Sequence, residues 1–150
     1  MSCSIRLVIT SEDMAKCHEV RLKVFTDEQG YDAASDVDEI DSKCLHWLVV
    51  DQNNQGVGTA RLYKYSPIVG KVGRVAVLTN IRGSGLGRLL MEAVEQHVLE
   101  NTQFETLALS SQLPRKGFYE KLGYIAEGEV YLDEGQPHIY MQKKLPKKTS

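Results

Sequence analysis

Residues 73–90 (GRVAVLTNIRGSGLGRLL) limit what this chain can fold into more than any other stretch. The apolar run at 75–78 is rich in β-branched residues and is typical of a buried strand. After a polar turn, apolar side chains recur every three or four positions from Leu86 to Val98, which predicts a helix with one apolar face. The segment therefore predicts a strand, a glycine-rich turn and a helix in direct succession.

The glycine-rich turn is a candidate anion-binding site. The first N–H groups of a helix have no partner within it and lie at the positive end of its dipole, and glycine lets a ligand approach that backbone closely. Three glycines and two arginines stand in the seven residues from Arg82 to Arg88. The alternative is a tight turn that uses glycine only to reach positive φ. The two arginines favour a phosphate ligand.

Spacing excludes two common phosphate-binding loops. A Walker loop requires Gly-x-x-x-x-Gly-Lys-Ser/Thr, and no Lys-Ser/Thr pair follows Gly83 or Gly85. A dinucleotide fingerprint requires Gly-x-Gly-x-x-Gly, but Arg88 stands where the third glycine would follow Gly83 and Gly85. The pattern that remains is Arg82-x-x-Gly85-x-Gly87.

This pattern resembles the acyl-CoA pyrophosphate loop of the GNAT superfamily of N-acetyltransferases. A second stretch at 117–124 (GFYEKLGY) is similar to a helix of the same superfamily. Further matching positions point to its ElaA/YjcF-like subgroup: Val20, Arg21, Val24, Phe25, Glu28, Gln29, Asp38, Glu39, Asp41, His46, Gly135, Pro137 and His138. The resemblance implies an α/β (α+β) fold with a mixed, twisted sheet of six or seven strands, about four helices and a splayed central strand pair.

Length and composition agree with a single domain at 1–145 followed by a polar tail at 146–150. A chain of 150 residues can bury about 70% of its unfolded surface. The net charge of −2 offers no general attraction to nucleic acid or to an anionic membrane. No apolar run approaches the ~20 residues of a membrane span, and no signal peptide is evident. Three cysteines (Cys3, Cys17 and Cys44) cannot all pair with one another and suit a reducing compartment, cytoplasmic or nuclear.

The residue pattern places strands at 5–9, 45–50, 58–65, 75–78, 106–111 and 138–143. Thr10 or Ser11 is expected to cap a first helix, and Pro114 to open a late helix that Gly123 closes. Lys147 and Lys148 fall in a tail expected to be disordered.

The resemblance implies transfer of the acetyl group of acetyl-CoA to a primary amine by direct attack in a ternary complex, with no metal. The residues expected to bind the cofactor are Val75, Ala76, Val77, Arg82, Gly83, Ser84, Gly85, Leu86, Gly87, Arg88 and Tyr119. The N–H of Val77 is expected to polarise the thioester carbonyl. Tyr119 is the expected general acid, because a phenol with a pKa near ~10 can protonate a departing thiolate.

The sequence does not identify the general base. Arg74 stands where many members of the superfamily carry a glutamate, and a guanidinium cannot serve as a base. The base is then a water chain or one of five side chains: Glu28, Asp38, Glu39, His46 or His138. Of these, His138 and Glu39 are our catalytic candidates, and Glu28, Asp38 and Glu39 are the candidates for binding the acceptor.

Two further alternatives bear on function. The acidic stretch at 27–41 (DEQGYDAASDVDEID) is either a solvated loop or one wall of a site for a cationic acceptor. A non-catalytic acyl-CoA-binding module is the alternative to an enzyme. An acyl-carrying Cys17 or Cys44 is disfavoured because neither lies at an evident helix N-terminus and a buried, inert cysteine is commoner. The expected partner is a small-molecule amine or a protein amino group. The superfamily also allows a homodimer.

Overall fold

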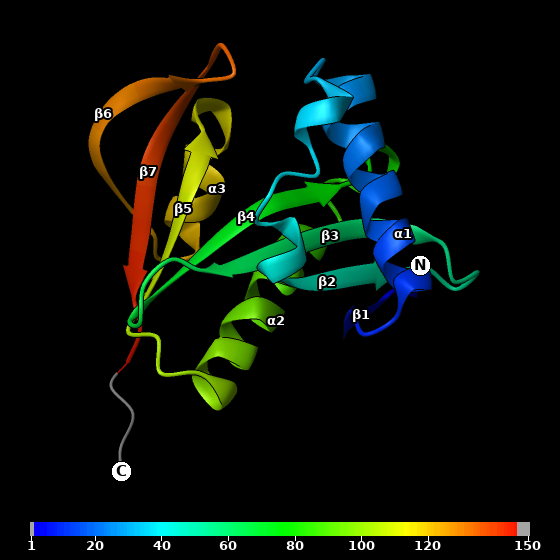
Figure 1. Cartoon of the computed structure of the whole chain (residues 1–150), viewed down its shortest axis with the longest axis horizontal. Coiled ribbons are helices and arrows are strands. Elements are labelled where there is room, and N and C mark those ends of the chain that lie inside the picture. Colours follow the sequence, from blue (N-terminus) through cyan, green and yellow to red (C-terminus); the bar gives the residue numbers. More distant parts are fainter. Residues whose placement is uncertain (1, 147–150) are drawn as a thin grey trace.

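The computed structural model describes residues 2–146, which form one seven-stranded sheet in the order β1-β2-β3-β4-β5-β7-β6 (Figure 1). The strands are β1 (Ser4–Leu7), β2 (Leu45–Val50), β3 (Gly56–Lys64), β4 (Val69–Val77), β5 (Thr106–Gln112), β6 (Ile125–Asp133) and β7 (Gln136–Lys144). Within these residues β4 and β5 are the only parallel neighbours, and every other pair is antiparallel. The mixed sheet predicted from the sequence is confirmed.

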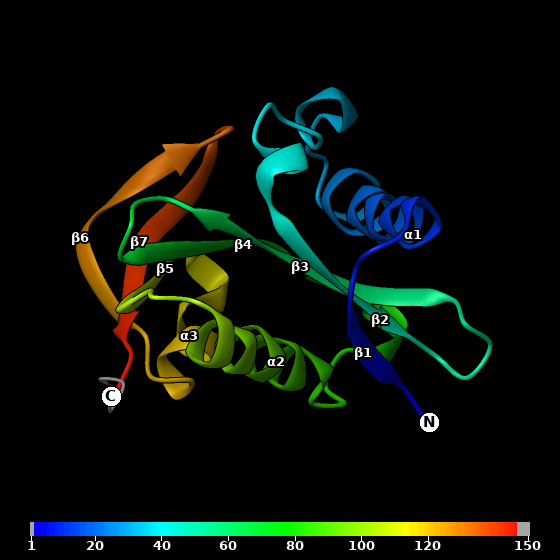
Figure 2. The same ribbon diagram turned by 60° about the horizontal axis from the view of Figure 1, so that its bottom comes forward.

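The helices lie on both faces of this sheet (Figure 2). On one face, α1 (Ser11–Arg21) runs directly into η1 (Leu22–Glu28), a π-helical segment; on the other face lie α2 (Leu86–Asn101) and α3 (Lys116–Lys121). Short 3-10 turns complete the list: η2 (Ala33–Ser35), η3 (Asp41–Lys43), η4 (Thr79–Ile81) and η5 (Leu113–Arg115). Residues 2–146 thus contain three α-helices rather than about four, because the first helix and the π-helical segment form one continuous coil.

Local sequence signals explain where the helices begin and how they pack. The Thr10 hydroxyl accepts a hydrogen bond from the Asp13 N–H (3.1 Å), which caps α1 as expected. Helix α2 buries one face against the sheet through Leu90, Met91, Val94 and Val98. Complete burial of each such side chain contributes about 1.5–3 kcal/mol, so this stripe anchors the helix that follows the glycine-rich turn.

Strand β6 was not predicted from the sequence. It is the edge strand of the sheet, and Ile125, Val130 and Leu132 are exposed on it, so its residues do not alternate between apolar and polar faces. Its pairing with β7 is interrupted between Glu127 and Tyr131. A strand that buries so little carries no periodic signal in its sequence.

The central strands β4 and β5 diverge along their length. They pair only where Val69–Val72 of β4 meets Thr106–Leu109 of β5, and the rest of each strand leaves its partner (Figure 1). The backbone edge of β4 that faces β5 is therefore unpaired over residues 73–77. The predicted splayed pair is confirmed. The tail at 147–150 lies outside the described residues, and within residues 2–146 no helix is long and apolar enough to cross a membrane.

Candidate active site

A cavity of about 640 Å³ occupies the opening between β4 and β5. Four groups of elements surround it: the second half of β4 with the turn before α2; the end of β5 and the start of β7 with α3; η1 with the segment that follows it; and part of β3. Because β4 and β5 are parallel, the cavity lies at the carboxyl ends of both strands, which is where open α/β sheets bind ligands.

The glycine-rich turn forms one end of the cavity. Gly83 (φ +85°) and Gly85 (φ +84°) adopt left-handed backbone conformations that favour glycine. Gly85 is the N-cap of α2 and offers no side-chain cap, so the first N–H groups of this long helix stay available beside the cavity. A Cβ on Gly87 would lie 3.2 Å from the Phe118 ring, so the helix also needs a small residue there. These features fit a bound diphosphate.

The cofactor-binding residues predicted from the sequence mostly line this cavity. Val75, Ala76, Val77, Arg82, Gly83, Gly85, Leu86, Gly87, Arg88 and Tyr119 all do so. Ser84 is the exception, since its hydroxyl donates to the Ile81 carbonyl (2.6 Å) and supports the turn from within. Arg88 pairs with Glu92 one turn along the exposed surface of α2.

Tyr119 reaches the cavity from α3 and is 9% exposed. Its ring packs edge-on against Phe118 (5.0 Å between centroids) and Tyr124 (6.0 Å). Its hydroxyl has no hydrogen-bond partner among residues 2–146. Burial raises the pKa of Tyr119 to about 12, against a small opposing effect of the Arg115 charge, so the phenol stays protonated at neutral pH.

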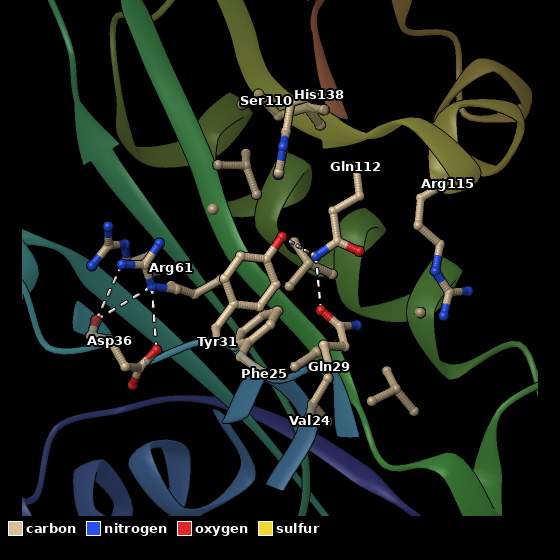
Figure 3. A pocket seen from close by; sticks show the side chains of 18 of the residues that line it. Val24, Phe25, Gln29, Tyr31, Asp36, Arg61, Ser110, Gln112, Arg115 and His138 are labelled. Atoms are coloured by element: carbon tan, nitrogen blue, oxygen red, sulfur yellow. Dashed lines mark hydrogen bonds and ion pairs between the residues drawn. The ribbon is translucent and has the colours of Figure 1, made fainter. Parts of the chain in front are cut away.

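His138 reaches the same cavity from β7 and is 6% exposed (Figure 3). Its Nδ1 lies 2.8 Å from the Gln136 carbonyl, so Nδ1 carries the proton in the neutral ring. The ring stacks on Tyr131 with 6.2 Å between centroids, which fixes its orientation. Nε2 is then a free lone pair that can accept a proton.

Of the other candidates for the general base, only Asp38 lines the cavity. Glu39 is exposed and lies outside it. His46 is buried away from the cavity, with Nε2 2.9 Å from the Asp41 carbonyl, and burial lowers its pKa. Glu28 faces Arg82 instead of the cavity. Cys17 is likewise outside the cavity, and burial raises its pKa, which does not suit a nucleophile.

Within the acidic stretch, the three aspartates at 36–41 are ion-paired instead of solvated or free. Asp36, Asp38 and Asp41 pair with Arg21, Arg61 and Arg74. Arg21 is fully buried and lies 3.0 Å from Asp36 and 2.9 Å from Asp41. Burial opposes ionisation of Asp41, but hydrogen bonds from His18 and Arg61 outweigh it and hold the pKa of Asp41 below its usual range. Asp38, which we expected to bind a cationic acceptor, accepts hydrogen bonds from Arg61 on both of its oxygens (2.9 and 2.8 Å), so we do not include it in the proposed acceptor site.

Many of the lining residues were not assigned to the site from the sequence, among them Gln29, Tyr31, Gln112 and Arg115. In Figure 3, Tyr31 extends into the middle of the cavity, with Gln29 and Gln112 meeting beside its hydroxyl and Arg115 entering from the end of η5. Gln112 ends β5, and the carboxyl end of a parallel strand was the signal that could have found it.

Known proteins share this architecture. Residues 12–145 match the family model described as the acetyltransferase (GNAT) domain. The chain is 31% identical over 133 residues to YjcF of Bacillus subtilis, an uncharacterized N-acetyltransferase, covering 88% of this chain and 93% of that protein. The crystal structure of Escherichia coli ElaA superposes with a TM-score of 0.85 at 25% identity, over 95% of this chain and all of that one. A GNAT family acetyltransferase from Elizabethkingia anophelis, solved with acetyl-CoA bound, shares the fold (TM-score 0.73, 15% identity, 95% of this chain and 98% of that chain).

The family match spans nearly the whole chain and agrees with the splayed strands and the glycine-rich turn found here. The resemblance to the ElaA/YjcF-like subgroup, made from the sequence motifs, is confirmed by the similarity to both of those proteins. This chain belongs to the GNAT acetyltransferase family.

Proposed function

We propose that the protein transfers the acetyl group of acetyl-CoA to a primary amine within a ternary complex, without a metal. The observation that carries this proposal is that one cavity combines three features. These are the unpaired edge of β4, the uncapped start of α2 and the side chain of Tyr119. An acetyl-CoA-bound neighbour of the same fold supports the choice of cofactor.

The backbone does most of the binding. The N–H groups of residues 86–88 at the start of α2 receive the diphosphate, and Arg88 and Arg115 add positive charge beside it. Val75, Ala76 and Val77 offer peptide groups to the amide-bearing arm as an added strand would, and the Val77 N–H orients the reacting carbonyl. When bound, acetyl-CoA supplies an activated thioester.

His138 is the general base of this proposal. Its Nε2 takes a proton from the attacking amine while Nδ1 stays bound to the Gln136 carbonyl, so the ring does not need to turn. Glu39, the other catalytic candidate, is not retained because it lies outside the cavity.

Tyr119 faces the departing sulfur as a hydrogen-bond donor. Its pKa of about 12 exceeds that of a thiol (~8.5) by roughly 3.5 units, so complete proton transfer to the thiolate is uphill by about 5 kcal/mol. We therefore assign Tyr119 to stabilising the developing negative charge, and the thiolate gains its proton from solvent after it leaves.

The acceptor is a small-molecule amine or a protein amino group, and a cytoplasmic location fits a protein that uses acetyl-CoA. The test uses the purified full chain with acetyl-CoA and a panel of amines, and follows the release of free thiol. Binding of acetyl-CoA with amine-dependent thiol release supports an enzyme. Binding without release for every amine would favour the non-catalytic acyl-CoA-binding module, and absence of binding would refute both.

A further inference from the structure

Two consecutive residues at the end of η1 reach toward opposite sides of the opening between β4 and β5. Glu28 contacts the turn that follows β4, and Gln29 contacts Gln112 at the end of β5. These two ends are the places where β4 and β5 have already separated. The segment at 28–29 therefore spans the open end of the cavity, and we call it the cross-tie.

The contact with the β4 side is a dense, charge-assisted network. Arg82 donates from both terminal nitrogens to the Glu28 carboxylate, at 2.8 Å for Nη2, and its Nε donates to the Val77 carbonyl (3.0 Å). The Thr79 hydroxyl donates to the same carboxylate (2.6 Å). Arg82 and Thr79 lower the pKa of Glu28, so the carboxylate stays ionised at neutral pH.

This network uses the guanidinium that the sequence assigned to the diphosphate. With Nε on Val77 and the two terminal nitrogens on Glu28, every nitrogen of the Arg82 side chain already donates to the protein. A bidentate arginine–carboxylate pair is the strongest geometry available to these groups. Arg82 is thus placed to hold the turn against η1.

The second contact of the cross-tie joins Gln29 to the end of β5. The Gln112 amide donates to the Gln29 side-chain carbonyl (2.8 Å) and lies 3.4 Å from the Tyr31 hydroxyl, as Figure 3 shows. Gln29 and Gln112 are 83 positions apart in the chain, so this bond joins the two halves of the fold across the cavity. The seven-residue π-helical segment that presents both ends of the cross-tie is an uncommon structure, and such segments often mark functional sites.

We propose that Glu28 and Gln29 are positioning residues that set the width of the cofactor cavity by tying the turn at Arg82 and the end of β5 to one helix. This inference rests on the proposed function, because it assigns acetyl-CoA to that cavity. In this arrangement Glu28 acts through Arg82 on the backbone N–H groups that bind the diphosphate. The side chain of Arg82 holds the turn in place and does not itself bind the diphosphate.

The alternative is that Glu28 occupies Arg82 only until the diphosphate displaces it. The two arrangements predict opposite effects of removing the carboxylate. If Glu28 is a positioning residue, Glu28→Gln weakens binding of CoA, and we expect the Kd for CoA to rise about five- to tenfold. If Glu28 competes with the diphosphate, the same change releases Arg82 and lowers the Kd.

The experiment is a double-mutant cycle on the full chain, with Kd for CoA measured by titration calorimetry in Glu28→Gln, Arg82→Ala and the double variant. Because both residues act through one contact, we expect the double variant to lose no more than either single one. The matched control is Glu19→Gln, which removes the exposed pair with Lys23 on the same helical coil and should leave the Kd unchanged. Losses that multiply in the double variant, or a lower Kd in Glu28→Gln, would overturn the proposal.

A second readout needs no ligand. Amide hydrogen exchange across residues 79–88 should accelerate in Glu28→Gln, and exchange at the end of β5 should accelerate in Gln29→Ala, while Glu19→Gln changes neither. Unchanged exchange in both variants would refute the cross-tie. If the wild-type chain did not bind CoA, the proposed function would be refuted. The hydrogen-exchange result would still decide whether the cross-tie holds the ends of β4 and β5 in place.

Discussion

Replacing Tyr119 by phenylalanine should slow acetyl transfer about a hundredfold while leaving the affinity for acetyl-CoA unchanged. The substitution removes a single oxygen that donates to no described residue, from a side chain that lines the cavity. Losing a hydroxyl without a partner costs the fold little, so the melting temperature of the free protein should stay the same. The loss should then fall on kcat alone, because the donor is used only as charge develops on the sulfur.

The size of the effect follows from the environment of the phenol. Removing one hydrogen-bond donor to a developing charge typically costs about 10²–10³-fold, and burial makes Tyr119 a weak acid with a pKa of about 12, so we expect the lower end of that range. A hundredfold loss corresponds to about 2.7 kcal/mol of transition-state stabilisation. The phenol acts as a donor only below its pKa, so the wild-type rate should not fall between pH 9 and about 11, where an ordinary tyrosine with a pKa near ~10 would ionise.

Tyr124→Phe is the matched control. Tyr124 is also buried and packs edge-on against Tyr119, but it does not line the cavity, so its variant should keep both kcat and Kd. Initial rates of thiol release and calorimetric Kd values for acetyl-CoA separate the two effects. If Tyr119→Phe kept its rate within threefold of the wild type, or lost as much affinity as rate, our reasoning about the donor would be wrong.

Three further changes test other parts of the molecule. His138→Gln should lower kcat about a hundredfold or more in the thiol-release assay, with the Kd for acetyl-CoA retained, since it removes only the proton acceptor; an unchanged kcat would assign the base elsewhere. Gly85→Glu should abolish acetyl-CoA binding in calorimetry, because it places a carboxylate at a left-handed position in the diphosphate site, whereas Gly128→Glu, also left-handed but outside the cavity, should bind normally. Asp41→Asn should destabilise the fold by about 3–5 kcal/mol in urea unfolding, since it leaves Arg61 short of a buried partner. Because the pKa of Asp41 is lowered in the folded state, its contribution is complete above the unfolded value (~3.9) and is lost as the pH falls below it, so the variant should show a shallower loss of stability in acid.

The parts of the site that follow from neighbouring residues could be predicted from the sequence. The strand at 75–78, the turn and the helix from Leu86 to Val98 were predicted because apolar periodicity and glycine spacing are local signals, and the turn at Arg82 needs left-handed conformations that its glycines supply. The structure extends this strand toward the N-terminus, so that β4 covers Val69–Val77. The splaying of β4 and β5 was predicted only from the family resemblance, because no local sequence pattern indicates which residues of two strands do not pair.

The contacts that join distant segments around the cavity could not be predicted in this way. Glu28 and Arg82 are 54 positions apart, and nothing in either neighbourhood specifies the other. The acidic stretch had the composition of a solvated loop, but Arg21 and Arg61 are buried and require nearby carboxylates. Pairing of this kind follows from tertiary burial, so the charge pattern of one segment cannot reveal it.

The position of the proposed base follows from what Arg74 does in the structure. Arg74 has a left-handed backbone (φ +50°) beside the irregular pairing of β3 and β4, and its guanidinium donates to the Asp36 carbonyl and to Asp38. Non-glycine residues persist in such a conformation only where their surroundings hold them, and here the held side chain anchors the wall formed by residues 35–38. A carboxylate at this position would lose those donors and would add charge beside Asp36 and Asp38. We therefore propose that the proton acceptor comes from another element, and His138, which lines the same cavity and is held on β7 by the Gln136 carbonyl, is our candidate.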